Sequence, residues 1–411
     1  MNFMDRRSPR SLLVSQPVSG LEWTELIYPD QPSFLSDGRS FVFQSSEGPQ
    51  VCYLGKKVRT RRLFNDKKPR EFVVTFDGRF AYYAESDKKG RGCVTLFRKD
   101  LETFRCEKLF HARSRLPGTN LPAAEFVPRT VSADNRRVGL KRFLLVNRRT
   151  KYASFGVAVL DLDNGQTRMV TVGRDVHNPH LQYCRSTDPE RSHDLLIQMN
   201  HGARFDERGC CLHGLGPPSD LGTDLHVVRD DGTNWRDLPF GRDGRESLIG
   251  HQVWRGETGA VAAVTLQNLD TSYGWAEGTR QDVVSGWPVK ASRYAHKGCL
   301  TPSGRRVLLS KGFPRARFCH LNCDASGLRF ALDTFPIFDG KRAGMQVFFG
   351  RAKDLNCPLK FTYLLNSGLT FLASDGATHA HPILSPDGSM LFFNSRASGA
   401  RQFYMVTGFE A

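Results

Sequence analysis

Two histidines separated by one residue lie near the C-terminal end of the chain, in the stretch Ala377-Thr378-His379-Ala380-His381-Pro382. In a β-strand, residues i and i+2 point to the same side, so His379 and His381 are expected to present their imidazoles together. This spacing suits the chelation of one divalent cation, because imidazole nitrogen is a common metal ligand. The alternative is that the pair is an exposed or core pair without a ligand.

A third histidine, His320, occupies an equivalent place in an earlier segment. It lies seven residues before Gly327, and His381 lies seven residues before Gly388. Equal offsets in consecutive copies of one structural unit predict that His320 and His381 are neighbours. The three histidines are therefore the candidate metal ligands.

The unit that positions them is marked by a recurring turn, which ends in Asp-Gly or Ser-Gly and is followed by an alternating apolar strand. Copies occur at Asp37-Gly38, Asp77-Gly78, Ser303-Gly304, Ser326-Gly327 and Asp387-Gly388, with a degenerate copy at Asp134-Asn135. Repeats of roughly 40–50 residues are typical of propeller blades, and a chain of this length holds about seven to nine of them. We therefore predict an all-β, seven-bladed β-propeller. A β-sandwich with long loops is the alternative, but it leaves the recurring turn unexplained.

The predicted division of the chain is simple. Residues 1–20 are expected to form an N-terminal extension, and residues 21–411 a single β-propeller domain. In a propeller, the innermost strand of each blade lines a central channel, and ligands usually bind at one mouth. Histidines placed just before the turns of several blades can therefore converge on one site.

The charge of the chain favours an acidic partner. Fifty-eight Lys and Arg residues against 42 Asp and Glu residues give a net charge of +16. A charge of this size speeds the capture of polyanions, which include nucleic acid, an anionic membrane surface and an acidic polysaccharide. The basic residues form short clumps, and the sequence has no helix-turn-helix, zinc-finger or RNA-recognition signature. We therefore expect no nucleic-acid partner.

The sequence also predicts a cytoplasmic protein. No stretch approaches the length of about 20 apolar residues that spans a bilayer, so no membrane partner is expected. The N-terminus has arginines but no apolar core of a signal peptide. Ten cysteines lie singly or as Cys210-Cys211, without the spacing of a zinc site or a disulfide framework.

Other histidines lie in two segments of the middle of the chain. The segment Gly250-His251-Gln252-Val253-Trp254 precedes another blade turn at Gly256–Gly259. The segment His177-Asn178-Pro179-His180 and the later His201 add three more. A single histidine is more often structural than catalytic, so none of these is decisive alone.

Together these segments resemble the oligogalacturonate lyases, which are cytoplasmic seven-bladed β-propellers that cleave pectin-derived oligosaccharides. The resemblance extends over roughly residues 175–411. It rests on the two middle segments, on Arg317-Phe318-Cys319-His320 with its turn, and above all on Thr378-His379-Ala380-His381-Pro382 with the turn that follows.

The resemblance implies a manganese-type site, with calcium or zinc as alternatives, whose ligands are His320, His379 and His381. It implies that His251 is the Brønsted base. Side chains expected to bind the acidic oligosaccharide are His177, His180, His201 and Arg317. Two positions depart from the family, since Gly376 stands where the family has a glutamine ligand and Asp224 stands near the place of an arginine.

The chemistry that these residues would support is β-elimination from a uronate, a carbon–oxygen lyase reaction. A divalent cation on the carboxylate stabilises the charge that develops when C5 loses its proton. A neutral imidazole takes that proton, because its pKa lies near working pH. Two other hypotheses stay open: a non-catalytic propeller that binds an acidic glycan or a protein, and a nucleic-acid-binding propeller. The latter rests on charge alone and gives the histidines no role.

Overall fold

The computed structural model describes residues 3–64, 71–87, 92–147, 152–201, 223–238, 240, 246–268, 280–287, 307–308, 313–314, 318–334, 337–339, 342–355, 357–368 and 379–409. Its internal contacts divide the chain into two compact units. Unit 1 comprises Met1–Lys68, His251–Gly286 and Val307–Ala411, and unit 2 comprises Pro69–Gly250 and Trp287–Arg306.

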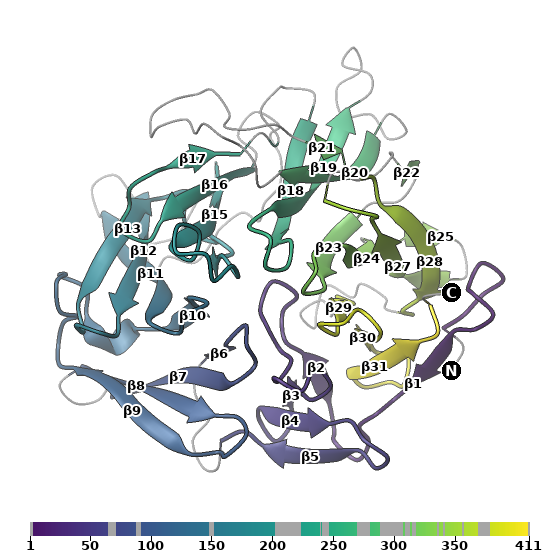
Figure 1. The fold of residues 1–411 in the computed structure, drawn as a ribbon, viewed down its shortest axis with the longest axis horizontal. Coiled ribbons are helices and arrows are strands. Elements are labelled where there is room, and N and C mark those ends of the chain that lie inside the picture. Colours follow the sequence, from purple (N-terminus) through teal and green to yellow (C-terminus); the bar gives the residue numbers. More distant parts are fainter. Residues whose placement is uncertain are drawn as a thin grey trace. The chain divides into compact units, whose positions relative to one another are not determined.

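The fold is an all-β propeller whose blades are small sheets of strands (Figure 1). Among the described residues, six of these sheets have four strands and one has five, in agreement with the seven blades that the sequence predicts. A further two-stranded hairpin joins β25 (Ile337–Asp339) to β26 (Arg342–Gly344). Within the described ranges, the only helical element is a 3₁₀ turn at Ala123–Glu125.

Unit 1 holds the blades that carry the candidate metal ligands. One blade, most of which belongs to unit 1, contains β18 (Glu246–Trp254), β19 (Val261–Asn268), β20 (Arg280–Trp287), β21 (Val307–Leu308) and the side strand β22 (Phe313–Pro314). The next contains β23 (Phe318–Cys323), β24 (Arg329–Thr334), β27 (Gln346–Arg351) and β28 (Lys360–Asn366). Another contains β2 (Thr24–Leu26), β3 (Phe41–Ser45), β4 (Gln50–Tyr53) and β5 (Arg59–Arg62).

The last blade is built from both ends of the chain. It contains β29 (Ile383–Leu384), β30 (Leu391–Ser395) and β31 (Gln402–Thr407), and its outer strand is β1 (Leu13–Ser15). Leu13 pairs with Thr407 and Ser15 with Met405 in antiparallel register. The expected extension at residues 1–20 therefore contributes a strand to a blade. The boundary at residue 20 and the single domain over residues 21–411 stay predictions.

Unit 2 holds three blades of the same pattern. The first contains β6 (Phe72–Val74), β7 (Phe80–Asp87), β8 (Cys93–Asp100) and β9 (Cys106–Ala112). The second contains β10 (Pro128–Val131), β11 (Arg137–Asn147), β12 (Tyr152–Asp161) and β13 (Thr167–Gly173). The third contains β14 (Gln182–Tyr183), β15 (Asp194–Asn200), β16 (Thr223–Arg229) and β17 (Arg236–Asp237).

The recurring Asp-Gly or Ser-Gly turn connects the first and second strands of a blade. Gly327, between β23 and β24, has a φ of 70°, and Gly388, between β29 and β30, has a φ of 71°. Such angles favour glycine because L side chains rarely adopt them. At Gly327 the space is also closed, since an added Cβ would lie 2.5 Å from the carbonyl oxygen of Arg255. The copy whose glycine is Gly304 lies outside the described residues.

Aromatic side chains join the blades of unit 1 through a common core. The rings of Phe41 on β3 and Phe392 on β30 have centroids 4.7 Å apart, and Phe403 on β31 lies 5.4 Å from Phe41. All three side chains are buried. Because closely packed interiors resist displacement, this core fixes the last blade, and with it the segment that precedes β29, against its neighbour.

No helix among the described residues is long and apolar enough to cross a membrane.

Candidate metal centre

His320 is held by an acidic side chain on the neighbouring strand of its own blade. It lies on β23 and is 3% exposed, while Asp333 on β24 is 0% exposed. The Nδ1 atom of His320 is 3.1 Å and 3.2 Å from the two carboxylate oxygens of Asp333. A carboxylate only accepts, so Nδ1 carries the proton and Nε2 keeps its lone pair. The carboxylate also accepts a hydrogen bond of 2.7 Å from the His320 backbone N–H.

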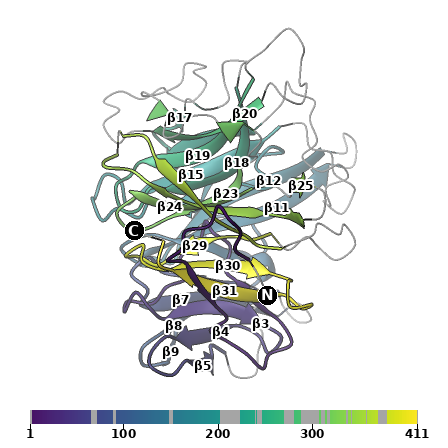
Figure 2. The same cartoon turned by 90° about the vertical axis from the view of Figure 1, so that its right-hand side faces the viewer.

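His379 and His381 lie in the segment that leads into β29, and β29 packs beside β23 (Figures 1 and 2). Their ring planes are nearly parallel, at 14°, with centroids 5.4 Å apart. The expectation that they lie in a strand is wrong, because β29 begins only at Ile383 and His381 has a φ of 43°. The parallel imidazoles arise from a turned segment instead.

The three histidines lie together, as their matching offsets from the turns predict. The His320 ring centroid is 4.4 Å from that of His381 and 4.9 Å from that of His379, nearly perpendicular to both. One ligand atom from each of the three lies within 4.8 Å of the others. The backbone N–H of His381 donates to Asp333 over 3.0 Å, so one carboxylate orders two of the ligands.

Burial keeps the ligand histidines in the form that binds metal. It lowers the pKa of His379, and it lowers that of His381 well below the ordinary value, so both imidazoles are neutral at neutral pH. Burial also raises the pKa of Asp333 to about 6, which leaves it ionised at pH 7. Neutral imidazoles backed by a carboxylate are a donor set that fits a divalent transition metal ion.

His251 lies next to this cluster on β18. Its ring centroid is 4.2 Å from that of His320, and its Nδ1 is 2.9 Å from the carbonyl oxygen of Cys319. A carbonyl oxygen can only accept, so Nδ1 of His251 is the donor and the lone pair of the neutral ring is on Nε2. His251 thus has the tautomer of a general base. Its φ of 58° is unusual for a residue other than glycine.

Tyr28 covers the same group of rings from the loop after β2. Its ring centroid lies 4.9 Å from His381, 5.6 Å from His320 and 6.4 Å from His251. Burial raises the pKa of its phenol, which is therefore uncharged. Sequence reasoning missed this residue because nothing in the spacing of the chain links position 28 to the histidines.

Asn322 ties the supporting segments together. Its side-chain oxygen accepts from the Leu384 backbone N–H over 2.8 Å, and its amide nitrogen donates to the Pro29 carbonyl over 2.7 Å. The residue lies on β23 and is buried. One side chain therefore fixes both the strand after His381 and the loop that carries Tyr28.

Cys319 is the other functional candidate that the sequence analysis left unassigned. Its sulfur is 3.8 Å from Nε2 of His320, 3.8 Å from Nδ1 of His379 and 3.9 Å from Nδ1 of His251. The residue is fully buried. Its position next to His320 in the sequence could have indicated that it lies near the site. Adjacent residues in a strand point to opposite faces, however, so the two were not expected to share a site.

The residues expected to bind substrate fall in unit 2 or outside the described residues. His177, His180 and His201 belong to unit 2, and Arg317 lies outside the described residues, as does Gly376. His180 Nε2 is 3.0 Å from the side-chain amide of Asn178. These positions are not tested by the geometry of the histidine cluster, and their role in binding stays a prediction.

His201 is clamped between two carboxylates. Its Nδ1 lies 3.2 Å from Asp175 and its Nε2 lies 3.3 Å from Asp224. The hydrogen bonds to Asp175 and Asp224 raise the pKa of His201 to about 9. Asp224, on β16, is therefore paired with the imidazolium of His201. This is near the position at which the resemblance to the lyases leads us to expect an arginine.

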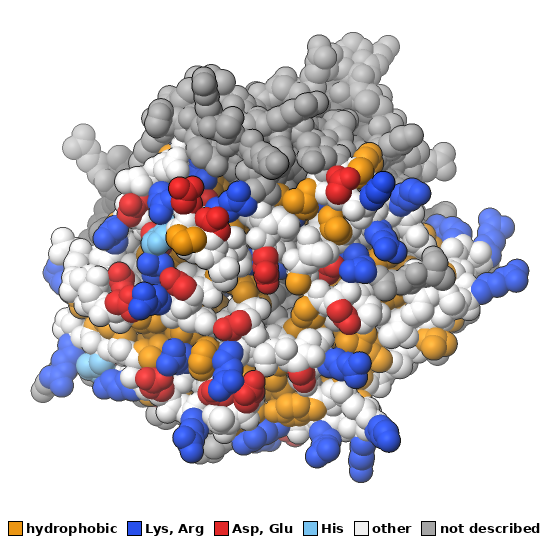
Figure 3. Space-filling model, in the orientation of Figure 1, with side chains coloured by type: hydrophobic (Ala, Val, Ile, Leu, Met, Phe, Trp, Pro, Cys, Tyr) orange, Lys and Arg blue, Asp and Glu red, His pale blue; other side chains and the backbone are white. Residues whose placement is uncertain are grey.

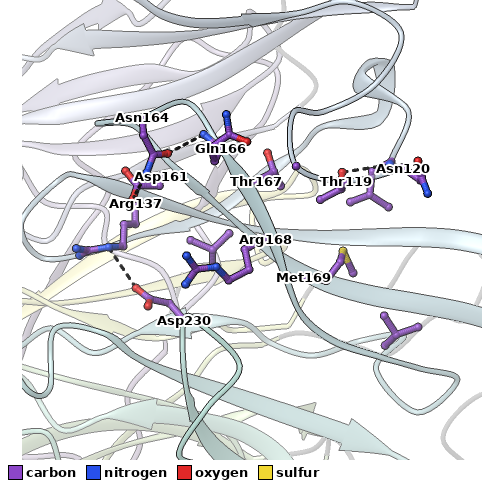
Figure 4. Close-up of a pocket in the computed structure, with 14 residues that line it drawn as sticks. Thr119, Asn120, Arg137, Asp161, Asn164, Gln166, Thr167, Arg168, Met169 and Asp230 are labelled. Atoms are coloured by element: carbon purple, nitrogen blue, oxygen red, sulfur yellow. Dashed lines mark hydrogen bonds and ion pairs between the residues drawn. The ribbon is translucent and has the colours of Figure 1, made fainter.

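Unit 2 also contains a cavity of about 520 Å³, shown in Figure 4. Arg137, Arg168, Asp161 and Asp230 are among its lining residues. The Nε atom of Arg137 lies 3.4 Å from Asp230. Both acidic and basic side chains line this cavity, and none of the candidate metal ligands does.

The comparisons with known proteins agree with the fold. No known family model and no curated protein matches the sequence. A solved oligogalacturonate lyase from Vibrio parahaemolyticus matches with a TM-score of 0.66 and 16% identity, covering 100% of this chain and 97% of its own. A structure of an oligogalacturonate lyase in complex with manganese gives a TM-score of 0.63, also at 16% identity, with coverage of 100% and 96%.

A more distant likeness is the tricorn protease, with a TM-score of 0.51 and 11% identity. The match covers 95% of this chain but only 34% of that protein. The full coverage by the two lyases also includes the part before residue 175, where the sequence offered only the blade repeat. The chain is thus a β-propeller with the fold of the oligogalacturonate lyases, which it resembles over its whole length at low sequence identity.

Proposed function

We propose that the protein is a metal-assisted lyase that cleaves short uronate-containing oligosaccharides by β-elimination, as an oligogalacturonate lyase does. The observation that carries the proposal is the position of His251. Its Nδ1 is committed to the Cys319 carbonyl, and its ring lies 4.2 Å from that of His320, a candidate metal ligand. A base and a Lewis-acid site are therefore adjacent.

His320, His379 and His381 would hold the metal, and manganese is the ion named for one of the similar lyases. Bound there, a divalent cation would neutralise the charge that grows on the uronate carboxylate. His379 and His381 would offer lone pairs to the ion because burial lowers their pKa, and Asp333 fixes a proton of His320 on Nδ1.

The protein's own residues supply the proton transfer. Nε2 of His251 takes the proton from C5 of the uronate, and the C5–H electron pair is held as an enolate on the neighbouring carboxylate. That pair then forms the C4–C5 double bond as the C4–O bond breaks, and the departing sugar oxygen takes a proton from solvent. A positioned general base of this kind contributes about 10²–10⁴-fold to the rate. Tyr28, whose phenol is neutral, packs against the rings of the three histidines that it contacts.

The net charge of +16 suits an anionic substrate. Figure 3 shows Lys and Arg side chains scattered among acidic ones over the face in view. This mixture does not favour a nucleic-acid interface, which needs a continuous basic surface. A cytoplasmic location stays a prediction from the sequence.

One observation favours a second candidate, a propeller that binds an acidic glycan without cleaving it. Asp224 is paired with His201, so this position supplies no free cation for a sugar carboxylate. If this reading is right, oligouronides bind and stay intact, and substitution of His251 leaves their affinity unchanged.

The test is incubation of the metal-loaded protein with pectic, glucuronate and algal oligouronides, while the ultraviolet absorbance of the unsaturated product is followed. The proposal predicts such a product from at least one of these substrates and its loss in His251→Asn. Intact substrate across the panel, with metal bound, would overturn it.

A further inference from the structure

We propose that Cys319 is a further ligand of the metal centre, so that the site takes a thiophilic divalent ion such as zinc rather than an ion that prefers oxygen. This inference rests on the metal site proposed above for His320, His379 and His381. It adds one donor to the three histidines.

The distances around the sulfur carry the argument. The Cys319 sulfur lies 3.8 Å from Nε2 of His320 and 3.8 Å from Nδ1 of His379. For a tetrahedral zinc ion with Zn–S of about 2.3 Å and Zn–N of about 2.0–2.1 Å, the edge between a sulfur and a nitrogen ligand is about 3.5 Å. The observed separations are within a few tenths of an ångström of that edge.

The protonation pattern points to the same atoms. Asp333 holds the proton of His320 on Nδ1, so Nε2 is the nitrogen with the lone pair, and Nε2 is the atom near the sulfur. His251 also approaches the sulfur, but with its Nδ1, at 3.9 Å. That nitrogen donates to the Cys319 carbonyl and so has no lone pair for a metal. In this arrangement His251 is the base and not a ligand.

A buried cysteine more often serves as a small apolar residue, and Cys319 does touch the core cluster of the last two blades. Two facts separate it from that ordinary case. Its sulfur lies within 3.9 Å of a nitrogen of each of three imidazoles. Its sulfur also groups within 4.8 Å with ligand atoms of His251 and His320, and His320 is shared with the group of His379 and His381. Cys323 on the same strand is the comparison, since its sulfur contacts the Trp254 carbonyl instead.

The donor types then determine which ion is preferred. Thiolate and imidazole ligands favour zinc and other late transition ions, whereas manganese favours carboxylate, carbonyl and water oxygens. Three imidazoles and one thiolate fill the four positions of a tetrahedral ion. A sugar carboxylate would then bind as a fifth ligand, as happens at catalytic zinc sites, or would replace a weakly held histidine.

The experiment is cobalt substitution of the full-length protein. Metal is removed with a chelator, Co²⁺ is added, and the absorption spectrum is recorded for the wild type, Cys319→Ser and the matched control Cys323→Ser. We expect a thiolate-to-cobalt charge-transfer band in the near ultraviolet for the wild type and Cys323→Ser. The band should be absent from Cys319→Ser. Competition should show that Cys319→Ser lowers zinc affinity by about 10–100-fold and manganese affinity far less.

The outcomes separate this inference from the proposed function. Cobalt bound by the wild type without a charge-transfer band would overturn the role of Cys319 and leave the histidine site intact. A band that survives in Cys319→Ser would do the same. No binding of cobalt or zinc would overturn both. Thiolate-bound metal in a protein that leaves every oligouronide intact would support the Cys319 ligand and contradict the lyase.

Discussion

The carboxylate of Asp333 connects His320 and His381, which come from different blades. One oxygen accepts from the His320 backbone N–H over 2.7 Å, and the other accepts from the His381 backbone N–H over 3.0 Å. The same carboxylate orients the His320 ring through Nδ1. A single buried side chain therefore sets both the direction of one ligand and the position of another.

Replacement of Asp333 by Asn is expected to lower metal affinity by about 10–100-fold, because an amide nitrogen cannot accept the bonds that the second carboxylate oxygen accepts. Affinity is measured by titration against a metal chelator. The control is Asp324→Asn, which alters a buried aspartate in the turn of the same blade that pairs with Arg329. Equal losses in the two variants would show that Asp333 acts only through stability.

His251→Asn should lower the elimination rate by about 10²–10⁴-fold with metal content unchanged. Asparagine tolerates the positive φ of this position, and its amide can keep the bond to the Cys319 carbonyl. Rates are measured at saturating oligouronide, with metal content from elemental analysis. The exposed His111→Asn serves as the control. Loss of metal together with activity would make His251 a ligand instead of a base.

The turn chemistry of the chain was sufficient to predict the blades. Asp-Gly and Ser-Gly pairs mark a local backbone requirement, and the φ angles of Gly327 and Gly388 satisfy it. The equal offsets then placed His320 beside His381, because equivalent positions of adjacent blades are neighbours. This part of the site is a property of the repeat and is therefore visible in one sequence.

Contacts that depend on packing could not be predicted in the same way. Asp333 reaches His381 across 48 positions of sequence, and Tyr28 reaches it from the other end of the chain. His379 and His381 do not lie in a strand, and the reason is local. The backbone of His381 has a positive φ and Pro382 follows it, so β29 begins only at Ile383. The alternation of apolar and polar residues predicts regular strands, and it does not predict such a turn.

Asn322→Ala is expected to lower the free energy of unfolding by about 2–4 kcal/mol, because it leaves the Leu384 N–H and the Pro29 carbonyl without their buried partner. It should also weaken metal binding, since both segments support the cluster. Denaturant unfolding and metal titration measure the two effects. The buried Thr130→Ala in unit 2, which removes the partner of the Tyr183 N–H, should destabilise without changing metal affinity. Unchanged metal affinity in Asn322→Ala would contradict the proposed support.

His201 should make stability depend on pH. Its pKa is raised to about 9 in the folded protein by its hydrogen bonds to Asp175 and Asp224, above the ordinary value of 6.5. The stabilisation is therefore fully present below about pH 6.5 and is lost as the pH rises through about 9. We expect a loss of roughly 1–2 kcal/mol over this range, less than the full shift implies because the ring is partly exposed.

The measurement is denaturant unfolding of the wild type and His201→Gln at several pH values between these limits. The variant should lose most of the pH dependence, whereas the exposed control His111→Gln should keep it. If the free energy of unfolding changes with pH equally in the wild type and in His201→Gln, the two carboxylates do not stabilise the protonated form of His201.

The central claim is that His320, His379 and His381 hold a divalent metal, since both the lyase chemistry and the role of Cys319 depend on it. Elemental mass spectrometry of the purified wild type and of the double variant His379→Ala/His381→Ala tests it most directly. We predict near-stoichiometric manganese, zinc or a related ion in the wild type and its loss in the variant. A wild type that holds no metal, even after reconstitution, would contradict the claim.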